Sequence, residues 1–428
     1  MSTEAGAVGA IAAEGVAADS IQPNRTLALL VVAHAVNHAQ AVILPLVFLK
    51  VIEEFGVGVQ AIAFLAAAGN IGSGMVQLTF AALTRIVSRR ALLGWGGILF
   101  GGGFAAQALA NGFGTFSLAN IASRIGGAPQ HPVGNGLLAE QYAPERRGFA
   151  ISAHIAGGNV GTVFVAVAGA FLIATFGWRG TSVLLGVPAI LVALLVLRLV
   201  RESGADRAAA IASGSVRHSF ATVLRDRDIR WIYLTSILGG GGRGLGVANL
   251  FALLYLTRVI RLDDATSGLM YGVLIVLSVP MPLVAGWLSD RIGRRSTIVG
   301  VYVGGAVGFA IFVLAGSSLP GLWLGIAVMG LFSFAESPQL QALLADIATP
   351  AIRDSAFSAY FTLAFGVGSL WTALYGTIID ALGEAQGLPL VFGLMAASFV
   401  LAALAMLPVR EPPIHHAGSI EVEAGAVP

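Results

Sequence analysis

The chain has 428 residues, of which 57% are hydrophobic and only 11% charged, and its mean hydropathy of +0.85 excludes an ordinary soluble domain and indicates an integral membrane protein. The formal net charge is only +2, and the basic residues lie in short clusters between apolar runs, which argues against a nucleic-acid partner. The chain has no cysteine, so disulfide bonds, thiolate metal sites and cysteine nucleophiles are excluded.

The two ends of the chain are predicted to be cytoplasmic tails. Residues 1–25 carry acidic side chains but no basic one before Arg25, so the positive start of a secretory signal is missing and we expect a disordered segment. Residues 408–428 hold turn formers and acids without apolar periodicity, which predicts a second tail.

Between the tails lie twelve apolar runs, each long enough to cross a bilayer core about 30 Å thick as a helix of roughly 20 residues. The runs are continuous, whereas the strands of a membrane barrel are short and alternate in polarity. The predicted fold is therefore an all-α membrane protein of twelve spans. The spans are predicted at residues 26–48, 59–82, 92–111, 115–139, 149–175, 180–199, 230–257, 267–288, 297–315, 320–344, 355–380 and 388–407.

The distribution of basic residues predicts the orientation. With a cytoplasmic N-terminus, eighteen basic residues fall on inner segments and only four on outer ones, which places both termini in the cytoplasm. The polar stretch 200–229 is then a cytoplasmic linker. It divides the chain into an N-terminal bundle, residues 26–199, and a C-terminal bundle, residues 230–407, of six helices each.

The two predicted bundles match in sequence at one constant shift of 206 residues. HPVGNGLLAEQYAPERRGFAISA, which begins at His131, aligns with SPQLQALLADIATPAIRDSAFSA, which begins at Ser337, and the alignment pairs Arg147 with Arg353. The shift spans an even number of helices, so the copies have the same orientation. We infer a duplication into parallel repeats, related about the membrane normal.

The segment GWLSDRIGRR, after the eighth predicted span, holds four charged residues among ten. Together with the two six-helix halves and the inner linker, it resembles the major facilitator superfamily over about residues 26–407. The signature G-x-x-x-D-R-x-G-R-R is met at Gly286, Asp290, Arg291, Gly293, Arg294 and Arg295. The resemblance implies that Asp290 and Arg291 form a conformational latch. For Arg294 and Arg295, a latch and a simple topological anchor stay equally open.

The first repeat carries an altered copy of this motif. Shifted back by 206, GWLSDRIGRR falls on FAALTRIVSR at residues 80–89, where Asp290 faces Thr84 and the acid is missing. A carboxylate at a helix end can cap a neighbouring helix and pair with adjacent arginines, contributing about 0.3–2 kcal/mol per contact. We therefore expect Thr84→Asp to shift the balance between inward-facing and outward-facing states.

Shorter motifs look like the fosmidomycin-resistance group of drug exporters. They are HAVNHAQ (His34, Asn37), EEF (Glu54, Phe55), QHP (His131, Pro132), RRG (Arg147, Gly148) and GGNVG (Gly157, Gly158, Asn159, Gly161). In that group an acid follows the first Asn, whereas His38 stands here. Thr162 also stands where many drug–proton antiporters have proline, and no Gln-Gly step follows Arg124, so these positions do not support antiport.

Charged and polar residues at membrane depth are candidates for a site, because a charge buried in lipid is costly and usually faces a cavity. In the superfamily the first, fourth, seventh and tenth helices surround the central cavity. Those four carry His34, Asn37, His38, Arg124, His131, Arg243 and Glu336. Arg243 and Arg124 are the predicted counter-charges for a small anionic or polar organic solute, while Glu336 and His131 are the predicted proton carriers.

Simpler interpretations of these residues stay open. Arg124 and Glu336 could form a structural ion pair between helices, and a histidine within a helix is more often a packing residue than a ligand. His34 and His38 have the i, i+4 spacing of a helical metal pair, but the sequence indicates no third ligand, so no metal is expected.

The absence of a G-x-x-x-x-G-K-[ST] motif means that no nucleotide cofactor is expected and that energy comes from an ion gradient, taken to be protons. The favoured function is proton-coupled efflux of a small-molecule solute by alternating access around a midplane site. We expect a monomer in the lipid bilayer of a bacterial cytoplasmic (inner) membrane.

Efflux has three alternatives. Uptake of an organic anion by proton symport uses the same parts. A non-transporting membrane sensor would be favoured by a fused signalling domain, and the sequence shows none. An intramembrane hydrolase needs a motif such as G-x-S-x-G or H-E-x-x-H, and the sequence has neither, so no enzyme is expected.

Overall fold

The computed structural model describes residues 21–57, 59–366 and 368–412, and within them the chain is helical, with no strands. The α-helices are α2 (Pro23–Phe55), α3 (Val59–Ile86), α4 (Arg89–Ala106), α5 (Phe113–Gly127), α6 (Pro132–Gln141), α7 (Pro144–Leu199), α8 (Ala205–Ala212), α9 (Val216–Arg225), α10 (Arg227–Gly239), α11 (Asn249–Leu254), α12 (Asp264–Leu277), α13 (Pro280–Ile292), α14 (Arg294–Leu314), α15 (Leu319–Phe332), α16 (Glu336–Ile347), α17 (Arg353–Gly366), α18 (Gly368–Leu382) and α19 (Glu384–Met406). Shorter 3₁₀ and π-helical turns are η1 (Gln107–Leu109), η2 (Ala128–Gln130), η3 (Gly240–Gly242), η4 (Gly244–Ala248) and η5 (Tyr255–Val259).

The helices follow the apolar runs of the sequence, and each predicted range falls on one helix or on consecutive ones. Within the described residues, seven helical stretches are long and apolar enough to cross a membrane. The fifth and sixth predicted spans form one of these, α7, which turns sharply at Gly177 (φ 61°, ψ 174°), a conformation that favours glycine. The all-helical fold is confirmed, while the count of twelve spans stays a prediction.

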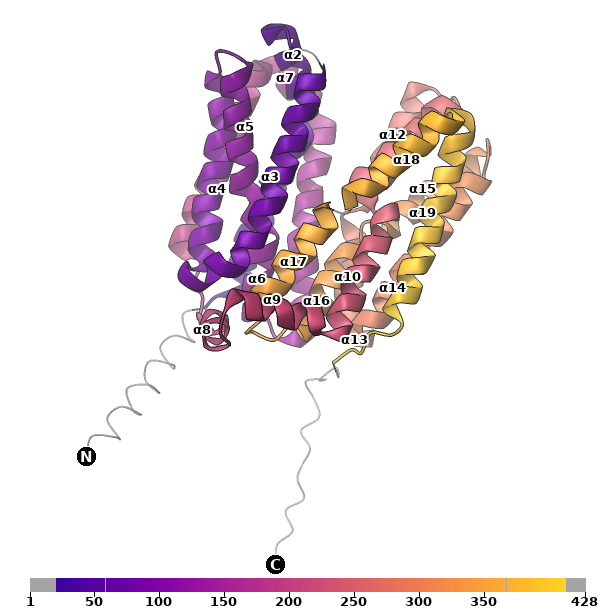
Figure 1. Ribbon diagram of the computed structural model, residues 1–428. Helices are drawn as coiled ribbons and strands as arrows, with labels where there is room; N and C mark the ends of the chain where they lie inside the picture. The colour runs from indigo at the N-terminus through magenta and orange to yellow at the C-terminus, as the bar shows by residue number, and fades with distance from the viewer. Residues whose placement is uncertain (1–20, 58, 367, 413–428) are drawn as a thin grey trace, which may run out of the picture.

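The chain forms two helical bundles, α2–α7 and α10–α19, that lie side by side (Figure 1). Their ribbons diverge at the end where α12 is labelled and approach each other at the end that carries α8, α9 and α13. The predicted linker therefore contains two short helices. The predicted N-terminal tail also ends earlier than expected, because α2 already begins at Pro23.

The bundles meet through repeat-related elements: α3 packs on α17, and α13 packs on α7. Near the axis between the copies, the Asn135 side-chain amide of α6 donates to the Gln341 side-chain oxygen of α16, and these residues are 206 positions apart. Gln339 of α16 also donates from Nε2 to the Ser152 hydroxyl of α7 at 2.9 Å. Contact between residues related by the shift supports the duplication inferred from the sequence.

Three helical stretches are interrupted, and the interruptions coincide with predicted site residues. His131 lies between η2 and α6, which begins at Pro132. Glu336 begins α16 after the break that follows α15. Arg243 separates η3 from η4 with a non-helical backbone (φ −56°, ψ 131°). In a membrane such breaks are tolerated only where protein or a cavity satisfies the freed backbone groups, as at ligand sites.

Candidate functional site

Arg243 and Glu336 form a buried ion pair in the C-terminal bundle. Arg243 Nε lies 2.8 Å from Glu336 Oε1, and the Tyr302 hydroxyl donates to Glu336 Oε2 at 3.2 Å. The Glu336 side chain is 1% exposed and that of Arg243 is 19% exposed, so each charge depends on the other. The alternative ion pair between Arg124 and Glu336 is therefore wrong, because the arginine that pairs with Glu336 is Arg243.

The glycine run before Arg243 lets bulky side chains pack against this backbone. A Cβ at Gly242 would lie 2.5 Å from the Phe399 ring, and one at Gly241 would lie 2.7 Å from the Ser398 hydroxyl. After the run, Gly244 donates its backbone N–H to the Ser333 carbonyl at 2.8 Å. This hydrogen bond joins the interrupted helical stretch around Arg243 to the one that precedes Glu336. Glycine at both positions of the run therefore serves close packing.

Histidines gather in the N-terminal bundle around His34. Its ring centroid lies 4.6 Å from that of His38, 4.7 Å from that of His131 and 4.5 Å from that of His154. One ring nitrogen from each of His34, His38 and His131 lies within 4.8 Å of the other two. His131 thus stands beside the pair as a third nitrogen donor from another helix, at a break that helical spacing could not reveal. The expectation that no metal binds stays a prediction.

The GGNVG motif of α7 makes room for this cluster. A Cβ at Gly158 would lie 2.8 Å from His38 Nε2, and one at Gly161 would overlap the Ala35 carbonyl of α2. Glycine at both positions lets α7 approach α2 closely. Asn159 of the same motif donates from Nδ2 to the Ser278 carbonyl at 2.8 Å, which ties α7 to the C-terminal bundle.

Arg124 and Asn37 lie on neighbouring helices of the N-terminal bundle. Arg124 Nε donates to Asn120 Oδ1 at 3.0 Å, and the stem of this arginine lies over Gly69 of α3, where any Cβ would overlap it. Asn37 of α2 lines a small internal cavity and lies beside Gly127. The structure thus separates the predicted site residues into an ion pair in one bundle and a polar, histidine-rich group in the other.

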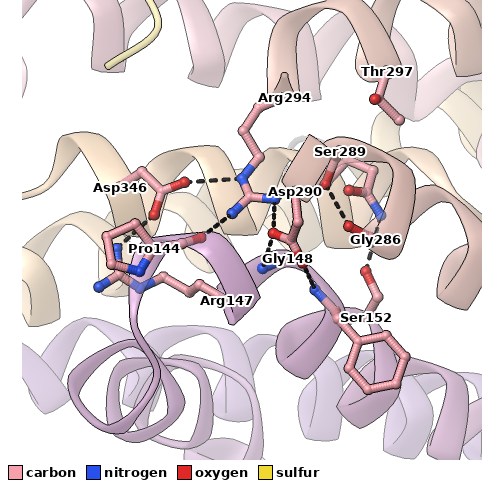
Figure 2. A network of polar contacts seen from close by, with 12 residues as sticks. Pro144, Arg147, Gly148, Ser152, Gly286, Ser289, Asp290, Arg294, Thr297 and Asp346 are labelled. Carbon is pink, nitrogen blue, oxygen red and sulfur yellow. Dashed lines mark hydrogen bonds and ion pairs between the residues drawn. The ribbon is translucent and has the colours of Figure 1, made fainter. Parts of the chain in front are cut away.

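Asp290, at the end of α13, binds the start of α7 in the other bundle (Figure 2). Its carboxylate accepts from the backbone N–H of Gly148 at 3.0 Å and of Phe149 at 2.9 Å. A carboxylate near a helix N-terminus is stabilised by the backbone N–H groups and the helix dipole. Asp290 also forms an ion pair with Arg294, four residues later.

Arg294 extends the contact between α13 and α7 with further polar contacts between the bundles. Its Nε lies 2.9 Å from Asp346 Oδ2, its Nη2 donates to the Pro144 carbonyl at 2.7 Å, and Arg147 Nη1 lies 2.5 Å from Asp346 Oδ1 (Figure 2). All four charged side chains are at most 10% exposed. We call the set of Arg147, Asp290, Arg294 and Asp346 the Asp290 junction.

The other motif residues have separate contacts. The Arg291 guanidinium lies 3.6 Å from the Trp287 ring centroid, and the arginine of the motif that pairs with Asp290 is Arg294. Arg295 donates from Nη1 to the Leu407 carbonyl at 3.3 Å. Gly286 lies against α7, where a Cβ would be 2.6 Å from the Ser152 hydroxyl, and Gly293 has a φ of 103°.

The altered copy of the motif forms a second junction around Arg89. Arg89 pairs with Glu140 of α6 at 2.5 Å, Asp206 of α8 at 3.0 Å and Asp354 of α17 at 2.8 Å. Arg353 lies 2.6 Å from the same Asp206. The first copy lacks the acid of the motif at Thr84, and other elements supply carboxylates in its place. We call the set of Arg89, Glu140, Asp206, Arg353 and Asp354 the Arg89 junction.

The sequence did not single out Tyr302, Asp206 or Asp354. Tyr302 lies in an ordinary apolar run, and Asp206 lies in a polar linker where an acid is unremarkable. Asp354 aligns with Gly148 at the constant shift of 206 residues. A carboxylate in one repeat where the other has glycine is the one feature of the sequence that could have singled out Asp354.

Known proteins of related sequence are transporters. A family model described as Major Facilitator Superfamily matches residues 29–370 and 242–426. The chain is 24% identical over 273 residues to the "Probable L-galactonate transporter" of Escherichia coli (strain K12). That match covers 61% of this chain and 60% of the relative, which is less than two thirds of its length.

Solved structures share the fold at low sequence identity. The proton:xylose symporter XylE, bound to a sugar, has a TM-score of 0.72 at 16% identity, with 91% of this chain and 96% of that chain covered. FucP in the outward conformation has a TM-score of 0.73 at 16% identity, with 89% and 98% covered.

Proposed function

Because the chain belongs to the Major Facilitator Superfamily, whose model matches residues 29–370, we propose that it is a secondary active transporter that takes up a small organic anion together with protons. It is an integral membrane transport protein of all-helical fold and not an enzyme. The solute class, the coupling ion and the direction are the proposed parts.

The observation that carries the proposal is the ion pair between Arg243 and Glu336, which lies at two helix breaks and is buried in the C-terminal bundle. A proton on Glu336 removes the negative charge that holds Arg243. The arginine keeps its own charge and then needs a new partner, because an unpaired buried charge is costly. An anionic solute supplies that partner with charge-assisted hydrogen bonds.

Binding of the proton and binding of the anion then favour each other, and by linkage the coupling is reciprocal. Mutual enhancement is the property of a symporter, whereas an antiporter requires that each ligand weaken the other. The ion pair therefore favours symport over the proton-coupled efflux that the sequence alone suggested. A relative described as a probable L-galactonate transporter agrees with a carboxylate solute, and XylE is described as a proton:xylose symporter.

Alternating access fits the way the two bundles meet. The Asp290 junction and the Arg89 junction both lie at the end where the ribbons approach, and the ribbons diverge at the other end (Figure 1). With both termini cytoplasmic and twelve spans, this arrangement is an outward-facing state whose cytoplasmic side is held closed by the junctions. The proposal assigns such a monomer to a bacterial inner membrane.

Export by proton antiport is the second candidate, and the motifs shared with the fosmidomycin-resistance group favour it. Among these motifs, GGNVG has a structural role in the N-terminal bundle, because two of its glycines let α7 pack closely on α2 beside the histidines. The sign of the driving gradient separates the two candidates. A symporter accumulates solute in vesicles when the outside is acidic, and an antiporter does so when the inside is acidic.

The test uses purified protein in lipid vesicles with labelled galactonate and other sugar acids, and neutral sugars for comparison. We expect an acidic exterior to drive accumulation of an acid but not of a neutral sugar. Glu336→Gln should abolish the response to the pH gradient yet keep exchange of labelled for unlabelled solute. Asp380→Asn, at an exposed residue of α18, is the matched control and should behave as wild type. Unchanged gradient-driven accumulation in Glu336→Gln would refute the proposal.

A further inference from the structure

The protonation of His34 is fixed by its surroundings. Its Nδ1 lies 2.7 Å from the backbone carbonyl oxygen of His154. A carbonyl can only accept, so the neutral ring carries its proton on Nδ1 and has its lone pair on Nε2. His34 is fully buried, and its Nε2 has no hydrogen-bond partner among the residues that the structure describes. A buried, unpartnered lone pair is costly unless something binds it.

His38 is oriented in the same way. Its Nδ1 lies 3.2 Å from the Thr162 hydroxyl oxygen, and that hydroxyl donates to the Gly158 carbonyl at 3.3 Å. When the hydroxyl proton points to Gly158, the Thr162 oxygen accepts from Nδ1–H of His38, and Nε2 then holds the lone pair. Histidines that bind metals typically donate the other ring N–H to a carbonyl or another polar group, as both rings do here.

His131 provides the third ring of the group. His131 stands edge-on to His34, with ring planes at 88°, and one nitrogen from each of the three rings lies within 4.8 Å of the others. Around a tetrahedral zinc ion with Zn–N distances of about 2.0 Å, ligand nitrogens lie about 3.3 Å apart. The ring nitrogens, now within 4.8 Å of one another, must therefore approach by up to about 1.5 Å when an ion binds.

We propose that His34, His38 and His131 bind one divalent transition-metal ion of the Zn²⁺, Co²⁺ and Ni²⁺ class. Imidazole nitrogen suits these ions, whereas Mg²⁺ and Ca²⁺ prefer oxygen ligands. Three neutral rings leave a fourth position, where hydroxide or another anion balances the charge of the ion. The site lies in the N-terminal bundle and does not use Arg243 or Glu336, so it stands independently of the proposed function.

His131 links the three-histidine site to the opposite bundle. Its ring stacks on Phe361 of α17, in the opposite bundle, with centroids 5.1 Å apart and planes at 27°. An ion that draws His131 towards His34 loosens this stack. Metal binding is therefore linked to a contact between the bundles.

The remaining histidines make a sharp test possible. The chain has 7 histidines, and those outside the cluster are His218, His415 and His416. Replacing these three by alanine, and purifying with a tag that lacks histidine, leaves only cluster residues to bind metal. Titration with Co²⁺ in detergent should then show visible absorption of nitrogen-ligated cobalt, one ion per chain, displacement by Zn²⁺ but not by Mg²⁺, and a raised unfolding temperature.

Two single variants in the same background test the ligands. His131→Phe keeps an aromatic ring against Phe361, and His38→Gln keeps a polar side chain of similar length. Each should weaken Co²⁺ binding by more than about 100-fold, since loss of a mere supporting hydrogen bond costs 10–100-fold. Their elution volume and metal-free unfolding temperature should match the background, which separates loss of a ligand from loss of fold.

The proposal is overturned if the triple-alanine background binds no Co²⁺ stoichiometrically while the unmodified chain does, because the ion then binds adventitiously to the outlying histidines. It is equally overturned if His131→Phe and His38→Gln bind Co²⁺ as the background does. Failure of the gradient-driven transport test has no bearing on either outcome.

Discussion

The Asp290 junction and the Arg89 junction lie at repeat-related places, yet they join the bundles by different chemistry. The first has two carboxylates and two guanidinium groups, and Asp290 also binds backbone N–H groups of α7. The second has three carboxylates around two guanidinium groups, with Arg89 in the centre. Duplication has thus preserved the place of the contact and part of its charge, since Arg147 corresponds to Arg353 and Asp346 to Glu140. The carboxylates Asp290 and Asp354 have no counterpart, because they align with Thr84 and Gly148.

The difference also involves the linker between the bundles. Asp206 belongs to α8, outside the bundles, and pairs with both Arg89 and Arg353. The Asp290 junction takes its carboxylates from α13 and α16, which belong to the C-terminal bundle. We infer that the Arg89 junction depends on the position of the linker, whereas the Asp290 junction is set by the bundles alone.

The largest effect is expected from Arg89→Ala. This change leaves three carboxylates of the Arg89 junction facing one another with a single arginine, and Arg89 itself is only 4% exposed. Removing one partner from a buried charge network costs about 3–5 kcal/mol in the free energy of unfolding. Denaturation of the purified protein in detergent measures this. Arg90→Ala, next in the chain and partly exposed, is the control, and an equal loss in both variants would contradict the central role of Arg89.

Asp290→Asn should have a smaller effect on stability but a clear effect on conformation. The amide keeps the shape, loses the ion pair with Arg294 and weakens the contact with the N–H groups of α7. A hydrogen bond to a charged group contributes about 1.5–3 kcal/mol, so the balance should shift by roughly tenfold or more towards a state in which the bundles separate at the junction end.

The absence of cysteine makes this shift measurable with introduced labels. Cysteines at Ile86 and Ile292, which are exposed and repeat-related, place a spin label on each bundle at the junction end. The distance between them should increase in Asp290→Asn and stay unchanged in Asp380→Asn. Identical distance distributions in all three proteins would show that Asp290 does not hold the bundles together.

Thr84→Asp tests the comparison at the Arg89 junction, to which it adds a carboxylate. From the sequence, restoring the acid was expected to shift the balance between the two states, and the structure now gives the direction. The acid would join a junction whose carboxylates already outnumber its arginines, next to α17, whose Asp354 replaces the glycine of the other copy. We expect at least about 1 kcal/mol of destabilisation from the buried carboxylate and a wider separation of the bundles at the junction end. A closer approach of the same labels would contradict this.

The smallest effect is expected from Arg291→Ala. Arg291 stacks on Trp287 outside both junctions, and a cation–π contact at an exposed position contributes about 0.5–1 kcal/mol. Label distances should match wild type, and stability should fall slightly. A conformational shift as large as that of Asp290→Asn would restore Arg291 to the latch.

Helix positions could be predicted from the sequence because length and hydropathy are local properties. The duplication was also readable, and contact between Asn135 and Gln341 agrees with it. Buried charges stood out for the same reason, since Arg243 and Glu336 interrupt apolar runs. What the sequence could not supply was their pairing, because both residues sit at helix breaks that redirect their side chains.

The histidines show the same limit. His34 and His38 share a face of α2 and were recognised together, whereas His131 joins them only because η2 and α6 interrupt their helix. The Arg89 junction was missed for a different reason. Its acids come from three separate elements, and spacing along the chain carries no information on contacts between segments so far apart.

The pH outside vesicles, followed while solute is added without any imposed gradient, tests the central claim most directly. Symport through the Arg243–Glu336 pair carries protons inward with the anion, so the exterior should become more alkaline when a transported sugar acid is added. Glu336→Gln should abolish this change. Acidification of the exterior, or an unchanged pH during measurable uptake, would contradict proton symport.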